Sequence, residues 1–522
     1  DGSIDTAHIA DAQITTAKIA SGYQLVTTDA QNNTVTGTEA GDAFSGTDAE
    51  NNSFYGYRAG TALTTGDNNV GFGNWSLYAS TTSSGNTAVG RSAVADNTTG
   101  AMNTGIGYQA LTSNTTANYN TTVGYDSMVY NTTGQANVGL GYKALYANTT
   151  ASNNTAVGSN SAQANTTGTS NTSVGNYSLA ANTTASYNTA VGYKAATATT
   201  TGDSITAIGS AALEANTTGD NNTAVGESAL QYNTTASNNT AVGKRALETN
   251  TTGAENTCLG SYALHANTTG YQNTAVGFEA LDSNTEGYRN TGIGYESLED
   301  NTTGDYNVGV GYRSLASNTT GNTNTAIGHA SLETSTTGSD NTALGRSALQ
   351  ANTTASNNTA LGGYALTANT TGAYNTAVGY QALDANTTGQ QNVALGRAAL
   401  TESTTASYNT AVGDGALLYT TTGNHNVGLG LSPLYANLTG TQNVALGNYA
   451  LDGNTAGSYN VGVGHHALSA NTTASYNSAL GYETLIANTT GQYNTAVGYQ
   501  ALDANTTTSS LTAIGASALG SN

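Results

Sequence analysis

Apolar, small and polar residues recur at fixed positions of a 17-residue pattern that covers most of the chain. The unit at residues 375–391 reads NTAVGYQALDANTTGQQ, and the pattern starts again at Asn392. The glycine of its NTAVG segment recurs from Gly56 to Gly515 in 27 steps of 17 residues, which gives 28 copies without an insertion or deletion. So short and strict a period is typical of a solenoid, in which each repeat forms one rung and contacts only its neighbours.

The apolar positions within a rung predict one short strand. Counted from the recurring glycine as position 0, position −1 is aliphatic, position −3 is Thr or Val, and position −2 is small. β-branched side chains favour a strand, in which −3 and −1 share one face and −2 takes the other. Position +4 is Leu in 23 of the 28 copies. We expect the core to form around positions −1, 0 and +4, represented by Val378, Gly379 and Leu383.

Polar positions predict the rest of the rung. Positions +7 to +10 read Asn-Thr-Thr-Gly or Asn-Thr-Thr-Ala, which is turn composition, and position −4 is Asn in 26 copies. Stacked at one residue per rung, these columns form Asn and Thr ladders with neighbouring backbones about 4.8 Å apart. The hairpin dipeptide Asn-Gly never occurs, and recurring Gly, Asn and Thr disfavour helix. The sequence therefore predicts an all-β fold, a parallel β-solenoid (β-roll) of 28 seventeen-residue rungs.

The chain divides into four segments. Residues 1–20 carry Ile at every fifth position and are predicted to be an associating stalk or cap, and residues 21–50 are an irregular capping segment. Residues 51–519 form the β-solenoid, and 520–522 are the C-terminal end. The single proline, Pro433, stands at position +3, which predicts a corner whose amide no neighbouring rung needs.

Each rung offers few large apolar residues, which leaves two arrangements open. One is a flat coil filled with alanine, and the other is a core that several chains share about an axis. The isoleucines of residues 1–20 cannot form a core alone, so they favour sharing. We expect a parallel homotrimer, with a self-contained monomeric solenoid as the alternative.

Composition narrows the range of partners. Only 8% of residues are charged and the net charge is −21, which argues against binding nucleic acid or an anionic membrane. No apolar run approaches the roughly 18 residues of a membrane span, so we expect no membrane insertion. The single cysteine, Cys258, stands at position −2 and is expected to be a small, inert, buried residue.

No candidate catalytic, cofactor-binding or metal-binding residue emerges from the spacing of the titratable residues. The six histidines follow no metal-ligand pattern, and acidic pairs such as Glu299-Asp300 are expected on a solvated face rather than flanking a glycosidic bond. The Asn-Thr-Thr segments are also glycosylation sequons, although turn ladders account for them.

Tyrosine at position +1 is the one candidate for surface binding, because it combines apolar area with a polar tip. Ladder stacking that stiffens the coil is the alternative interpretation. The predicted aromatic column comprises Tyr108, Tyr125, Tyr142, Tyr193, Tyr295, Tyr312, Tyr380, Tyr482 and Tyr499.

The segment 375–379 resembles the N-S-V-A-I-G motif in the head repeats of YadA-type trimeric autotransporter adhesins, shortened by one residue. Tandem NTAVGYQAL repeats also resemble those of phage tail-fibre-like proteins, and residues 1–20 resemble their short S-I-x-T-x-x-I-A-D repeats. The resemblance implies a left-handed β-roll that trimerises about a long axis at an extracellular, cell-surface or virion-surface location. The rung here is longer than that of the adhesins.

We expect an extracellular structural or adhesive fibre with no catalytic role: a tail-fibre-like shaft, a surface adhesin or a filament subunit. Its expected partners are further copies of itself, in a homotrimer or in end-to-end or lateral assembly, and cell-surface glycans. One alternative is an ice- or crystal-binding β-solenoid that presents Thr and Asn ladders. Another is a fibre-borne glycan depolymerase.

Overall fold

The computed structural model describes residues 27–44 and 48–520. The stalk or cap predicted for residues 1–20 lies outside the described residues. Every regular element within the described ranges is a β-strand, and none of them is a helix. The chain divides into two compact units, Asp1–Thr252 and Gly253–Asn522, which are described separately.

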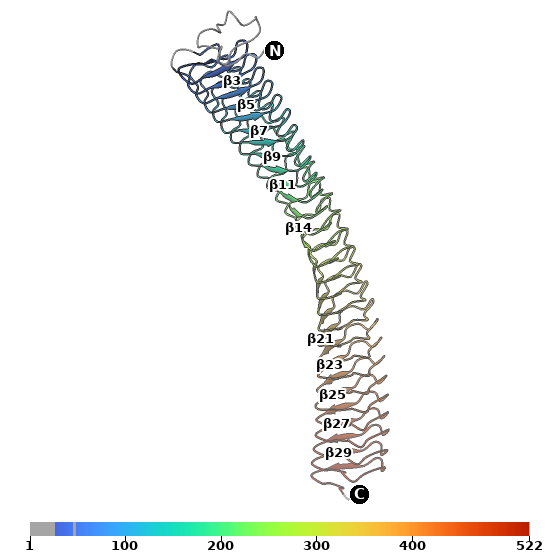
Figure 1. The fold of residues 1–522 in the computed structure, drawn as a ribbon. Helices are drawn as coiled ribbons and strands as arrows, with labels where there is room; N and C mark the ends of the chain where they lie inside the picture. Colours follow the sequence, from blue (N-terminus) through green and yellow to red (C-terminus); the bar gives the residue numbers. More distant parts are fainter. Residues whose placement is uncertain (1–26, 45–47, 521–522) are drawn as a thin grey trace, which may run out of the picture. The chain divides into compact units, whose positions relative to one another are not determined.

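The first unit is a stack of parallel strands (Figure 1). β1 pairs antiparallel with β2, and β2 pairs parallel with β3, so parallel stacking already begins inside the segment 21–50. From β3 to β13 each strand pairs in register with the strand 17 residues later, as Thr87 does with Thr104. The strands are β1 (Thr27–Thr28), β2 (Thr34–Thr36), β3 (Ser53–Tyr55), β4 (Val70–Phe72), β5 (Thr87–Val89), β6 (Thr104–Ile106), β7 (Thr121–Val123), β8 (Val138–Leu140), β9 (Thr155–Val157), β10 (Thr172–Val174), β11 (Thr189–Val191), β12 (Thr206–Ile208), β13 (Thr223–Val225) and β14 (Thr240–Val242).

The second unit repeats this arrangement. All its strand pairs are parallel with the same 17-residue offset, as between Thr376 and Val393. The strands are β15 (Thr257–Leu259), β16 (Thr274–Val276), β17 (Thr291–Ile293), β18 (Val308–Val310), β19 (Thr325–Ile327), β20 (Thr342–Leu344), β21 (Thr359–Leu361), β22 (Thr376–Val378), β23 (Val393–Leu395), β24 (Thr410–Val412), β25 (Val427–Leu429), β26 (Val444–Leu446), β27 (Val461–Val463), β28 (Ser478–Leu480), β29 (Thr495–Val497) and β30 (Thr512–Ile514). The fold is the predicted parallel β-solenoid, with about 28 turns at 17-residue spacing.

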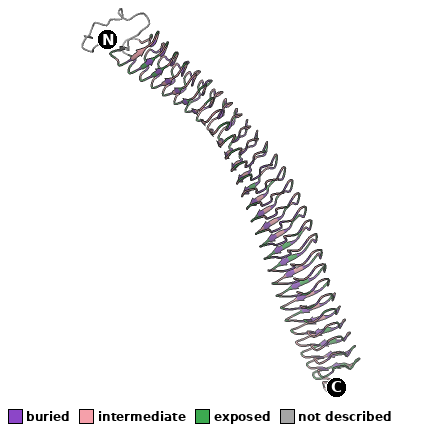
Figure 2. Cartoon of the chain, turned by 45° about the vertical axis from the view of Figure 1, so that its right-hand side comes forward, coloured by how far each residue is buried: buried purple, intermediate pink, exposed green. Residues whose placement is uncertain are grey.

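The strands turn their small residue inward and their β-branched residues outward. In every strand from β3 to β30 the middle residue is buried, while the residues on either side are half-buried or exposed (Figure 2). Within β22, Ala377 is fully buried, whereas Val378 is half-buried on the outer face. This corrects the assignment of Val378 to the core. The aliphatic column at −1 belongs to the outside of the coil.

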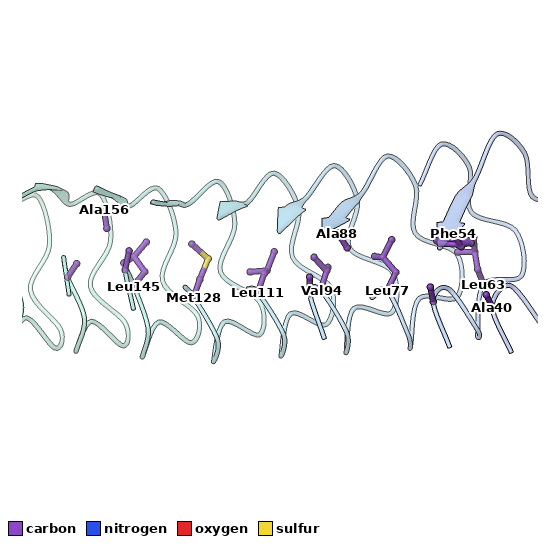
Figure 3. Close-up of a cluster of buried hydrophobic side chains, with 14 residues drawn as sticks. Ala40, Phe54, Leu63, Leu77, Ala88, Val94, Leu111, Met128, Leu145 and Ala156 are labelled. Carbon is purple, nitrogen blue, oxygen red and sulfur yellow. The ribbon is translucent and has the colours of Figure 1, made fainter. Parts of the chain in front are cut away.

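The core of each rung consists of the small residue at −2, a small residue at +3 and the leucine at +4. Ala382 and Leu383 are fully buried, and Leu383 faces the strand from the opposite side of the coil. Figure 3 shows this arrangement in the first unit, where Leu77, Leu111 and Leu145 stand in single file from one wall and Ala88 and Ala156 point inward from the strands. Each turn of the chain therefore has an interior of its own.

The turns are bonded from rung to rung as regularly as the strands. The amide of Leu383 donates to Ala399 O at 3.0 Å, and the amide of Thr387 donates to Thr404 O at 2.9 Å. An insertion would break such bonds, which explains the unbroken period. The amide at +3 instead closes a turn within its own rung, as Ala382 does with Gly379 O at 3.4 Å. The prediction from Pro433 is confirmed.

Two columns of buried asparagines cross-link the rungs. At position −4, the amide of Asn375 donates to Asn358 Oδ1 at 2.9 Å and its Nδ2 donates to Gly389 O at 2.9 Å. At position +7, Asn386 Nδ2 donates to Asn369 Oδ1 at 2.8 Å and to Gly389 O at 3.0 Å. Both asparagines are 0 to 1% exposed. Because buried amides are costly unless bonded, each ladder fixes the register of one rung on the next.

The +7 ladder is interrupted where Ser or Thr replaces Asn. Asn386 Oδ1 then loses the donor that the following rung supplies elsewhere, because Ser403 is too short to reach it. The same orphaned oxygen precedes each of three interruptions within the described part of the chain. The pairs are Asn182 before Thr199, Asn318 before Ser335, and Asn386 before Ser403.

Ser335→Asn is therefore expected to stabilise the second unit by about 1–2 kcal/mol, because it lies between Asn318 and Asn352, satisfies the buried Asn318 Oδ1 and restores the ladder. Neighbouring rungs accommodate Asn at this position, so the site has the necessary width. The measurement is thermal melting together with hydrogen exchange of the flanking rungs. Thr388→Asn places the same side chain at an exposed position and is the control. Equal melting temperatures of the two variants would contradict this account of the ladder.

Candidate functional site

The outer sheet face is an apolar surface that runs along each unit. We use this name for the side chains at −3 and −1 of strands β3–β30, which point away from the core. Twelve aliphatic residues at −1 are exposed, with exposed fractions from 37% for Ile106 to 73% for Ile514. These residues are Ile106, Val123, Ile208, Leu259, Ile293, Ile327, Leu344, Leu361, Leu395, Leu429, Leu480 and Ile514.

This face is flat and continuous within each unit because consecutive strands are in register. Leu344 pairs with Leu361 and Thr342 with Thr359, so like residues follow one another along the stack. The largest exposed apolar patch of a typical monomer covers roughly 300–600 Å², whereas the apolar column at −1 continues along every strand of a unit from β3 onward. A surface of this kind marks an interaction site.

The tyrosines at position +1 are on the surface, but they form separate stacks rather than one track. Eight of the nine predicted residues are 44–54% exposed, and Tyr108 is half-buried. Tyr108 and Tyr125 stack with ring centroids 5.0 Å apart, as do Tyr295 and Tyr312 at 5.4 Å and Tyr482 and Tyr499 at 5.6 Å. Non-aromatic residues at +1 of intervening rungs end each stack.

Stacking changes what these rings offer to a ligand. In the pair Tyr295 and Tyr312 the ring planes are 8° apart, and Tyr312 also stacks on His329 at 5.1 Å. A second tyrosine column, at position +12, behaves in the same way, with Tyr476 between Tyr459 and Tyr493. The ring faces contact one another, so edges and hydroxyl groups point to solvent. A sugar that packs on ring faces finds them covered except at the ends of a stack.

The Asn-Thr-Thr sequons are not accessible in the folded chain. Asn386 is fully buried, and both hydrogens of its Nδ2 are donated, to Asn369 Oδ1 and Gly389 O. An oligosaccharide on this nitrogen would remove the ladder bond and hold the rungs apart. The folded structure therefore favours the interpretation of these segments as turn ladders.

Chemical variety is concentrated at positions +2 and +5, which we call the variable face. These positions supply many of the ion pairs, including Arg313 Nη1 to Glu296 Oε2 at 2.5 Å, Arg313 Nε to Glu333 Oε1 at 2.7 Å, and Lys194 Nζ to Glu214 Oε1 at 2.9 Å. The repeat does not fix the residue type here, so the variable face can differ from rung to rung while the core stays constant.

Three carboxylates meet on the variable face of the second unit. Glu279, Glu296 and Glu299 offer oxygens within 4.8 Å of one another. Burial, followed by the charges of Glu296 and Asp300, raises the pKa of Glu299 to about 7. The ion pair of Glu296 with Arg313 offsets part of this charge, and carboxylates at a surface commonly cluster without a ligand. Sequence reasoning noted Glu299 and Asp300 but could not bring residues from adjacent rungs together.

The raised pKa predicts a pH-dependent effect of Glu299→Gln. In the folded chain Glu299 keeps a proton up to about pH 7, above its ordinary pKa of 4.5, so the folded state binds more protons and this site stabilises the fold as pH falls. The variant is expected to melt higher than the parent chain near pH 8, and the difference should shrink as pH falls below 7 and vanish near pH 4, below the ordinary pKa of 4.5. Glu402→Gln, which lies away from the cluster, is the control. The same shift in melting temperature at both pH values would contradict the assignment.

The cysteine and the adjacent histidine pair do not form a recognisable catalytic or metal-binding arrangement in the described part of the chain. Cys258 is fully buried at position −2, and burial raises the pKa of its thiol, so it is a poor nucleophile. His465 and His466 lie in a turn with ring centroids 4.2 Å apart, where His465 stacks on Tyr482 and His466 on Tyr449. These contacts extend the aromatic stacks.

Comparison with known proteins adds no family assignment: no family model matches the chain, and no curated protein matches it. Within the residues that the structure describes, no helix is long and apolar enough to cross a membrane.

Proposed function

We propose that the chain is an extracellular structural and adhesive fibre without a catalytic role, and that copies of it associate through the outer sheet face. The observation that carries the proposal is the unbroken apolar column at −1 within each unit, which is aliphatic from Val89 onward. An apolar surface of this length is a liability for a dispersed monomer. When identical chains associate in register, the outer sheet face of each chain packs against the same face of its neighbour and is covered.

A parallel homotrimer is the assembly that we favour. Each chain has a thin core of its own, and the outward residues at −3 and −1 supply a second apolar layer that three chains share about an axis. The resemblance to YadA-type heads and to tail-fibre-like proteins supports this number of chains, a left-handed coil and a location on a cell or virion surface. The variable face remains outside such an assembly and is free to contact other molecules.

Light scattering of the purified chain tests the proposal. We expect a native mass near three times 52.3 kDa. Replacing the outward residues Leu344 and Leu361 together with lysine places like charges in the shared layer, and we expect the mass to fall toward 52.3 kDa with the β-sheet circular dichroism retained. Replacing Gln381 and Gln391 with lysine adds the same charge elsewhere and is the control. A parent chain of 52.3 kDa would overturn the assembly.

The same face supports a second candidate, the binding of ice or another crystal. Threonines at −3 lie in register along it, as Thr342, Thr359 and Thr376 do, with aliphatic residues beside them. A flat, regular array of hydroxyl and methyl groups suits a periodic solid surface. This candidate requires a face that stays uncovered, so it is favoured by a monomeric mass combined with thermal hysteresis that the Leu344 and Leu361 lysine variant loses.

A further inference from the structure

The variable face of the first unit contains a groove beside the only tryptophan of the chain, Trp75. The groove has a volume of about 330 Å³, within the roughly 300–1,000 Å³ of small-ligand sites. It exists because one rung carries small residues, Ser92 and Ala95, at +2 and +5, while the preceding rung carries Trp75 and Tyr78 at the same positions. The larger side chains form one wall above the smaller ones.

Asp96 stands at +6 of the rung that carries Ser92 and Ala95, and the other polar groups of the groove come from rungs on either side. Arg58, Asp96 and Gln109 line it together with the two rings. Among the described residues, no hydrogen bond or ion pair engages the Asp96 carboxylate or the Gln109 carboxamide, so both can bind a ligand. Arg58 is held by an ion pair with Glu39 at 2.5 Å. One apolar wall and several convergent hydrogen-bonding groups are the usual composition of a small-molecule site.

The walls of the groove are fixed before any ligand arrives. The guanidinium of Arg91 lies 5.1 Å from the centroid of the Trp75 ring and 5.8 Å from that of Tyr108, which holds the indole in place. Thr112 Oγ1 donates to Ser92 O at 3.0 Å and to Gln109 O at 2.8 Å, which anchors the opposite side. A preorganised site loses less free energy on binding.

We infer that this groove binds a neutral hexopyranoside unit of a glycan. The apolar face of a pyranose ring packs against an aromatic side chain, and its neighbouring hydroxyl groups match a carboxylate that accepts and a carboxamide that both donates and accepts. The exposed carboxylate and the net charge of −21 disfavour an acidic sugar. The inference rests on the proposed adhesive role and names the class of ligand that the fibre recognises.

The second unit has a groove of related composition. Ser432 at +2 opens a groove of about 310 Å³ that Tyr435, Tyr449 and Asp452 line. An aromatic wall and a small residue at +2 thus recur far along the sequence, with a carboxylate that stands at +5 rather than at +6. The variable face is a scaffold on which the repeat can place such grooves one by one.

Fluorescence of the full chain tests the inference directly, because Trp75 is its only indole. The probes are maltose, cellobiose, lactose and diacetylchitobiose as neutral disaccharides, and glucuronic acid as the anionic probe. We expect at least one neutral disaccharide to change the emission saturably, in the millimolar range or tighter, and to bind more tightly than glucuronic acid. Asp96→Asn should weaken this binding about tenfold. Asp384→Asn, at +5 of a rung outside the groove, should leave it unchanged.

Three results would overturn the inference: no saturable change with any neutral probe, tighter binding of glucuronic acid, or equal effects of the two aspartate variants. Light scattering of the same samples separates this failure from failure of the proposed function. An assembled mass without a sugar response refutes the groove and leaves the fibre. A sugar response from a chain of 52.3 kDa refutes the assembly and leaves the groove.

Discussion

Leu383→Asp is expected to destabilise the second unit by about 3–5 kcal/mol, the cost of an unpaired charge in a protein interior. Leu383 is fully buried, and the neighbouring +4 residues, Leu366 and Leu400, are fully buried as well. The carboxylate would therefore face leucine above and below, with only small residues across the coil. Local opening of the rung costs less free energy than burial of an unpaired carboxylate. We therefore expect the stack to separate locally around residue 383.

The control is Gln381→Asp, which introduces the same group two residues earlier on the variable face. Gln381 is half-buried, and its φ of 55° is a conformation that aspartate tolerates better than most residues. Gln381→Asp should leave the melting temperature nearly unchanged. Thermal melting gives the total effect, and hydrogen exchange of peptides around residues 366–400 shows whether the loss is local. Equal melting of both variants would refute the assignment of the +4 column to the core.

Gly379→Ala is expected to cost about 3 kcal/mol or more, although it adds a single methyl group. The residue has a φ of 136°, which L side chains rarely adopt. A Cβ there would lie 2.4 Å from Gly396 O and 2.6 Å from Gly396 C of the next rung. Both are backbone atoms of a bonded coil and cannot move aside without breaking the stack. The rungs at 379 and 396 are therefore expected to separate.

Gly363→Ala tests whether this cost comes from position 0 rather than from any loss of glycine. Gly363 follows the position 0 glycine of its rung, and the atom nearest to an added Cβ is Tyr380 Cδ2 at 3.8 Å, an ordinary contact. We expect it to be neutral or slightly stabilising, because alanine restricts the unfolded chain. If Gly379→Ala melted like Gly363→Ala, the close approach of the position 0 glycines would not be a determinant of the fold.

The leucine at +4 adopts an unfavourable backbone conformation, and burial of its side chain offsets the cost. Leu383 has a φ of 53°, and nearly every +4 residue shares this left-handed conformation, which is unfavourable for a side chain with a Cβ. The sequence gives no sign of it, since glycine or asparagine would be the expected residue there. Burial of a leucine stabilises by roughly 1.5–3 kcal/mol, which outweighs the strain.

The sequence by itself determined the period, the strand at −3 to −1, the turn at +3 and the absence of hairpins from the 17-residue rungs. An exact 17-residue repeat without insertions allows only a stack in which every residue meets its own counterpart. Pro433 located the corner because it has no amide hydrogen to donate. These features follow from the residues of one rung and from the repeat length, so they can be predicted from the sequence alone.

The tertiary structure decided which strand face is inside, because alternation along a strand is the same for either choice. The coil is too narrow for an aliphatic residue opposite the leucine: at Gly428, position −2, an added Cβ would already lie 2.5 Å from Leu417 Cδ1. The small residues therefore turn inward, and Val378 with the rest of the −1 column turns outward. Burial of the asparagine ladders and the groove at Trp75 likewise depend on contacts between rungs, which no single repeat specifies.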